Sequence, residues 1–156
     1  MPLLLLVILA IVFSPGSAAA HVGRGNAYAT KGEFEKAIDE FTKALTLDPK
    51  LAAAYYNRGN AYLHRNDHNK AIADYTKAIE IDPRDPQYYN NRAAAYLMAK
   101  DDQKAVNDFT EAIRLNGRLA HAYFGRSVAF AELGDIGRSE ADLLKVRELD
   151  PNIGKK

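Results

Sequence analysis

The chain has 156 residues and an almost balanced charge, with 21 lysine and arginine residues, 20 aspartate and glutamate residues and a formal net charge of +1. This balance lacks the basic excess that is typical of proteins that bind nucleic acid, so we expect no nucleic-acid partner. The chain has no cysteine, which excludes disulfides, thiolate metal sites and a cysteine nucleophile.

The first twenty residues carry no charged side chain, and an unbroken apolar run from Leu3 to Phe13 is followed by small residues. This pattern is typical of a secretory signal peptide, although the segment before the run lacks lysine and arginine. At 1.5 Å per residue the run spans about 16 Å, too short for a hydrocarbon core of about 30 Å. We expect residues 1–17 to be a signal peptide cleaved after Ala18 or Ala20, so that the protein is periplasmic or secreted. The alternatives are an uncleaved membrane anchor, with membrane contact only through residues 1–13, and a true start upstream.

The pentapeptide Arg-Gly-Asn-Ala-Tyr occurs at residues 24–28 and again at residues 58–62, which is 34 residues later. This interval divides the chain into four units, 18–51, 52–85, 86–119 and 120–153. Counted from the start of each unit, position 8 is small, position 10 is alanine, position 11 is aromatic, position 20 is small and position 24 is large and apolar. Positions 4, 8 and 11 have helical spacing, and so do positions 20, 24 and 27. Each unit is therefore predicted to contain two helices.

Both ends of the second helix carry boundary signals. Position 16 is always acidic, which suits a helix start. Position 32 is proline in three units and Gly117 in the other, which favours a turn. In the fourth unit, Glu140 and Arg147 replace apolar residues at positions 21 and 28. That replacement predicts an outer face that no fifth unit covers.

The 34-residue pattern resembles the tetratricopeptide repeat. The resemblance implies an all-α domain over residues 18–156, built as a right-handed superhelical solenoid of four antiparallel helix-turn-helix hairpins. Two positions depart from the family pattern. Position 4 is His21 in the first unit and tyrosine in the others, and position 7, usually leucine in the family, is always arginine.

A basic residue at position 7 and an acidic residue at position 23 recur in every unit. A ligand site rarely needs four copies, so we predict structural ion pairs, each contributing about 0.2–1 kcal/mol if exposed. The alternative is an arginine ladder that binds an anionic partner. The predicted pairs are Arg24 with Glu40, Arg58 with Asp74, Arg92 with Asp108 and Arg126 with Asp142.

In the family, positions 2, 5, 9, 12 and 13 of the first helices line a concave groove. Here these positions are mostly apolar, with a few amides, and a soluble protein seldom exposes such a patch without using it. The alternative is that part of the set packs between hairpins. The predicted groove residues are Val22, Asn26, Tyr56, Asn60, Leu63, Asn90, Leu97, Phe124 and Val128.

The groove lacks the cations with which some family members hold the acidic tail of heat-shock chaperones. Asn26 and Asn57 match the two asparagines of that clamp, but Val22, Gln87 and Asn91 stand at its three cationic places. A carboxylate would not be held there, so we reject this ligand.

We find no residue pattern typical of catalysis, of a metal site or of cofactor binding, and we expect none of these. His64 and His68 fall on either side of a predicted turn, which does not favour a metal pair on one helix face. The resemblance implies a non-catalytic module that binds a peptide segment of a partner protein in its groove, with an oligomeric state that the sequence leaves open. The alternative is a subunit of a membrane-associated complex, held by the N-terminal apolar segment and an edge of the stack.

Overall fold

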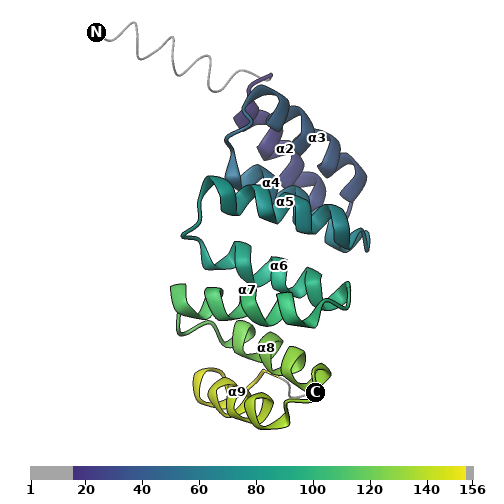
Figure 1. Cartoon of the computed structure of the whole chain (residues 1–156). Helices are drawn as coiled ribbons and strands as arrows, with labels where there is room; N and C mark the ends of the chain where they lie inside the picture. The colour runs from purple at the N-terminus through teal and green to yellow at the C-terminus, as the bar shows by residue number, and fades with distance from the viewer. Residues whose placement is uncertain (1–15, 154–156) are drawn as a thin grey trace, which may run out of the picture. The chain divides into compact units, whose positions relative to one another are not determined.

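The structure is a computed structural model that describes residues 16–153. Within that range it contains eight α-helices and no strands (Figure 1). Most of the predicted leader, residues 1–15, lies outside the described residues. None of the helices described is long and apolar enough to cross a membrane.

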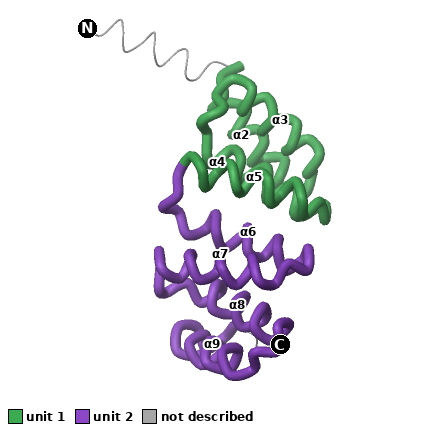
Figure 2. The backbone as a smooth tube through the Cα atoms, viewed as in Figure 1, with its two compact units in different colours: residues 1–81 green, residues 82–156 purple. Residues whose placement is uncertain are grey.

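The helices form two compact units, which divide after Ile81 (Figure 2). The helices of unit 1 are α2 (Ala18–Thr30), α3 (Phe34–Leu47), α4 (Ala52–His64) and α5 (His68–Ile81). The helices of unit 2 are α6 (Pro86–Met98), α7 (Asp102–Leu115), α8 (Ala120–Glu132) and α9 (Ile136–Leu149).

Each unit consists of two helical hairpins packed on one another. In unit 1, α2 packs against α3 and α4 against α5, and the two hairpins meet where α3 contacts α4. In unit 2, α6 packs against α7 and α8 against α9, and the hairpins meet where α7 contacts α8. The predicted all-α fold of repeated helical hairpins is therefore confirmed.

The helix boundaries follow the predicted signals. Asp101 and Asp135, both at position 16, accept hydrogen bonds from backbone N–H groups three residues later. Every second helix ends two residues before position 32, so the proline or glycine at that position lies in the turn. The turn between the two helices of each hairpin has its position 15 in the left-handed backbone region, and these four residues are Gly32, Asn66, Lys100 and Gly134.

The core of each of the first two hairpins depends on a close approach between the glycine at position 8 and the ring at position 24. The ring at position 24 is fully buried in Phe41 and Tyr75 and nearly so in Phe109. A Cβ atom on Gly59 would lie 2.8 Å from the Tyr75 ring, which is closer than van der Waals contact allows. Glycine at this site therefore makes room for the ring. The aromatic residues at position 11 of the first three hairpins are half-buried, and they are Tyr28, Tyr62 and Tyr96.

The fourth hairpin ends with a polar outer face. Glu140 and Arg147 are both exposed, as the sequence predicts. Leu144 lies on the same helix with 64% of its surface exposed.

Candidate functional site

The structure brings together each of the four predicted ion pairs. In three of them two of the three guanidinium nitrogens engage the carboxylate, with Arg58 Nε and Nη2 each 2.8 Å from the oxygens of Asp74. The corresponding distances are 2.6 and 2.8 Å from Arg92 to Asp108 and 2.7 and 2.8 Å from Arg126 to Asp142. In the first hairpin, Arg24 Nε lies 2.7 Å from Glu40.

These arginines are held from several sides. The guanidinium of Arg58 lies 5.6 Å from the ring centre of Tyr55 and 6.0 Å from that of Tyr62, the aromatic residues at positions 4 and 11 of the same helix. Its Nη1 donates a hydrogen bond to Thr42 of the preceding hairpin. The side chains of Arg58 and Asp74 are only 17% and 7% exposed. The Arg58–Asp74 pair is therefore not an exposed one, because the aromatic rings and the neighbouring hairpin cover the arginine.

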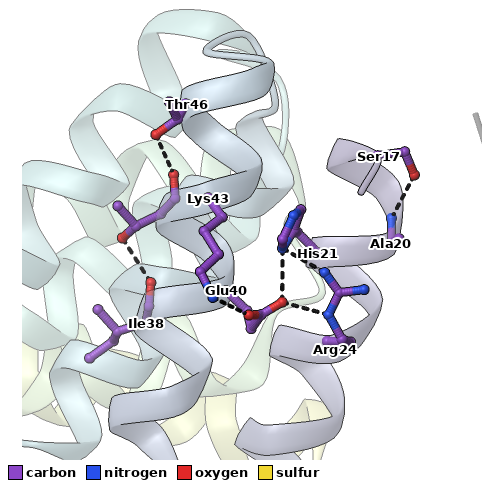
Figure 3. Close-up of polar contacts among 9 residues, drawn as sticks. Ser17, Ala20, His21, Arg24, Ile38, Glu40, Lys43 and Thr46 are labelled. Atoms are coloured by element: carbon purple, nitrogen blue, oxygen red, sulfur yellow. Dashed lines mark hydrogen bonds and ion pairs between the residues drawn. The ribbon is translucent and has the colours of Figure 1, made fainter. Parts of the chain in front are cut away.

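The first hairpin has a different arrangement because position 4 is His21. His21 Nδ1 lies 2.8 Å from a Glu40 oxygen, and Arg24 and Lys43 bond to the same carboxylate (Figure 3). The hydrogen bond from Lys43 is the main cause that lowers the pKa of Glu40 to about 2, with further contributions from Arg24 and His21. Glu40 is therefore held firmly in its charged form at neutral pH.

The groove of unit 1 is lined largely by polar side chains that bond to one another. A cavity of about 370 Å³ lies among α2, the first half of α3 and α4, with four amide and hydroxyl side chains in its lining. Asn57 Nδ2 donates to Asn26 Oδ1 at 2.9 Å, and the Tyr75 hydroxyl donates to Asn60 Oδ1 at 2.7 Å. The ring of His64 stacks on Phe34 with the ring centres 4.5 Å apart.

The other predicted groove residues of unit 1 are tied to its core. Tyr56 contacts the buried ring of Tyr75, with the ring centres 5.9 Å apart. Val22 packs partly buried against the core of the first hairpin, and Leu63 is also half-buried. Part of the predicted set therefore packs against core residues of the unit. The alternative that part of the set packs between hairpins stays a prediction.

The groove of unit 2 is different, because its lining is largely apolar. A cavity of about 470 Å³ lies between α6 and α8, with Phe109 of α7 in its lining. We call it the α6–α8 pocket, and its lining residues are Asn90, Ala94, Leu97, Met98, Lys100, Asp102, Phe109, His121, Phe124, Gly125, Val128 and Glu132. Met98 is 53% exposed, and Phe124 and Val128 are each 37% exposed.

The α6–α8 pocket contains all four groove residues that the sequence predicts for unit 2. Asn90, Leu97, Phe124 and Val128 line it together. Since the nine predicted residues divide between the two units, the expectation that all nine line one groove stays a prediction.

Two residues of the α6–α8 pocket have no repeated signal in the sequence. Lys100 and Asp102 come from the turn before α7 and from its first residue. Position 17, which Asp102 occupies, is phenylalanine, histidine or isoleucine in the other units. A search for recurring residues therefore passes over Asp102.

Two polar atoms in this pocket stand out, because they are buried and have no hydrogen-bond partner among the described residues. They are Asn90 Oδ1 and Asp102 Oδ1. An acceptor buried without a partner typically costs about 1–3 kcal/mol.

The described part of the chain contains no group of three or more histidine or acidic residues that could hold a metal ion.

Comparisons with known proteins point to one family. Family models described as tetratricopeptide repeat match residues 52–85 and 74–107, and a model described as TPR repeat matches residues 25–65. A comparison with curated proteins by sequence gave no match.

Solved structures agree with these matches. The first TPR of Spaghetti (RPAP3), bound to the HSP90 peptide SRMEEVD, is 33% identical with a TM-score of 0.65, over 66% of this chain and 82% of that one. The crystal structure of MamA is 24% identical with a TM-score of 0.83, over 87% of this chain and 74% of that one. YrrB, whose structure is described as a TPR protein with an unusual peptide-binding site, is 23% identical with a TM-score of 0.80, over 94% of this chain and 75% of that one.

Proposed function

Because the chain belongs to the tetratricopeptide repeat family and is a protein-interaction module, we propose that it binds a peptide segment of a partner protein in the α6–α8 pocket. The observation that carries this proposal is the exposure of Met98, Phe124 and Val128 around one cavity. Apolar side chains gathered in a concave site are typical of a surface that a partner covers.

The contrast between the α6–α8 pocket and the polar cavity at Asn26 and Asn60 of unit 1 supports the choice of the α6–α8 pocket. In unit 1, Asn60 already accepts a hydrogen bond from Tyr75, and Asn26 accepts one from Asn57. A peptide there would have to compete with these bonds. In unit 2 the apolar side chains are solvent-exposed, so their burial by a peptide would contribute about 25 cal/mol for each Å² removed from water.

The peptide differs in chemistry from the acidic peptide in the Spaghetti (RPAP3) structure. The groove positions that would hold a carboxylate are Val22, Gln87 and Asn91, which carry no charge. The pocket favours a segment with one or two large apolar side chains as anchors. The function is non-catalytic binding, in keeping with the general character of the family.

Selection from a phage-displayed library of random dodecamers tests the proposal. The wild-type protein should enrich sequences with large apolar residues, and Phe124→Ala should weaken binding of an enriched peptide at least tenfold, or about 1.4 kcal/mol. The matched control is Leu144→Ala, which removes an exposed apolar side chain from α9 outside the pocket. If both variants bind like the wild type, the peptide does not dock in the α6–α8 pocket.

We also propose that the protein acts after export. The apolar run up to Phe13 and the small residues that follow it support cleavage near Ala18. Intact-mass measurement of the periplasmic or secreted protein should give a chain that begins at Ala19 or His21. The full-length 17.2 kDa chain in the membrane fraction would instead favour the membrane-associated subunit.

A further inference from the structure

We infer that the α6–α8 pocket selects a peptide with a basic side chain beside its apolar anchor. This inference rests on the proposed function and adds the charge of the ligand. It follows from the polar groups at one end of the pocket, where a carboxylate is left without a partner.

The end of the pocket near Met98 has an excess of negative charge. Asp102 and Glu132 contribute two carboxylates, and Lys100 contributes one ammonium group. Lys100 Nζ lies 3.9 Å from Glu132 Oε2, and both side chains are at least half exposed. The charge of Lys100 therefore neutralises that of Glu132 only loosely. The negative charge of Asp102 is left without a compensating cation in the lining of the pocket.

The side chain of Asp102 forms no recorded hydrogen bond or ion pair with the residues that the structure describes, and its Oδ1 is buried. A carboxylate accepts hydrogen bonds only, so its missing partner is a donor. Rotation of the carboxylate about its soft terminal torsion can present an oxygen to the cavity. A lysine or arginine side chain supplies both the donor and the opposite charge.

Val128 and Glu132 line the pocket on α8, and their separation gives the distance between its apolar surface and its acidic end. Val128 and Glu132 are four residues apart, which places them about 6 Å apart along the helix axis. An extended peptide covers that distance with two residues, and a helical peptide covers it with four. The ligand class is therefore a peptide with a large apolar residue and a lysine or arginine within four positions of it.

The same dodecamer selection tests this inference when the enriched sequences are examined for charged residues. The wild-type protein should enrich lysine or arginine within four positions of a large apolar residue. An enriched dodecamer should bind at least tenfold more tightly than its copy with the basic residue changed to glutamate, measured by fluorescence anisotropy.

The variant Asp102→Asn with Glu132→Gln should reduce this preference to less than threefold while its thermal midpoint stays well above the temperature of the binding measurement. Asp39→Asn with Glu140→Gln is the matched control, because it removes the same two charges from exposed sites outside the pocket. The control should keep the tenfold preference. Raising the NaCl concentration from 50 to 500 mM should narrow the preference of the wild type.

The outcomes separate this inference from the proposed function. Apolar enrichment with no basic residue, or a preference that survives in Asp102→Asn with Glu132→Gln, would overturn the inference and leave groove binding standing. A selection that enriches nothing, or enriched peptides that bind Phe124→Ala as tightly as the wild type, would overturn both.

Discussion

The arginine at position 7 shows how one residue type can serve the same structural purpose in every hairpin. Arg58 bonds to Asp74 of its own hairpin and to Thr42 of the preceding one, between two tyrosine rings. Arg126 repeats this arrangement with Asp142 and Thr110. The sequence predicts the carboxylate partner from its constant spacing, but it does not predict the threonine or the burial, which depend on how two hairpins pack.

Replacing Arg58 should therefore destabilise the protein more than loss of a surface ion pair. Arg58→Leu leaves the carboxylate of Asp74 buried without its partner, and we expect a loss of about 2–4 kcal/mol in the free energy of unfolding by urea denaturation. Arg58→Leu combined with Asp74→Ala should recover part of that loss, because the unpaired charge is gone. A loss below about 1 kcal/mol for Arg58→Leu would show that the burial contributes little.

Glu40 gives a pH dependence to the first hairpin. Its pKa falls from an ordinary 4.5 to about 2, first through the hydrogen bond from Lys43. A lowered pKa stabilises the folded state above pH 4.5, and this contribution is lost as the pH falls towards 2. Because Lys43 is 57% exposed and screened by solvent, we expect about 1–2 kcal/mol.

Glu40→Gln measures this contribution directly. Urea denaturation at several pH values should show that the variant is less stable than the wild type at pH 7 and that the difference shrinks between pH 4.5 and 2. Curves for the two proteins that stay parallel over this range would contradict the assignment.

At the scale of the elements, the four turns that join the two helices of a hairpin differ at position 15, and the turn of the third hairpin has an uncommon residue there. Lys100 has a φ of 62°, in the left-handed region where the other turns have glycine or asparagine. This conformation costs a residue with a Cβ about 1–2 kcal/mol. Lys100→Gly should therefore raise the free energy of unfolding by about 1 kcal/mol, after the entropy that glycine loses on folding.

Asn66→Gly is the control for this prediction. Asn66 has a φ of 60°, but asparagine tolerates the left-handed region, so the gain there should be smaller. Thermal or urea denaturation of both variants gives the comparison. A larger gain for Asn66→Gly than for Lys100→Gly would contradict the argument from backbone strain.

The helices and their boundaries could be predicted from sequence because their signals are local and repeated. Asp101 at a helix start and Pro83 after a helix end each act within one turn of the chain. The groove was harder to predict, because its character depends on a side chain from another helix. Tyr75 replaces the phenylalanine found at position 24 of two other hairpins, and its hydroxyl donates a hydrogen bond to Asn60 Oδ1. That hydroxyl is a visible signal, but its target appears only in the folded hairpin.

At the scale of the whole molecule, four similar hairpins provide two different grooves. Unit 1 joins Asn26 to Asn57, whereas unit 2 leaves Met98 and Phe124 exposed around the α6–α8 pocket. The repeat pattern predicts where the grooves lie, but it does not predict which one has an exposed apolar lining. The apolar lining of the α6–α8 pocket is the basis of the proposed binding function.

The methyl group of Met98 provides the most direct test of that function, because the chain has only two methionines. Met98 lines the pocket and is half exposed, so its ¹³C-labelled methyl resonance, assigned with Met98→Leu, reports on the site itself. Titration with a dodecamer enriched on the wild-type protein should shift or broaden this resonance until the peptide saturates. A peptide that saturates the protein and leaves the Met98 methyl resonance unchanged would contradict binding in the α6–α8 pocket.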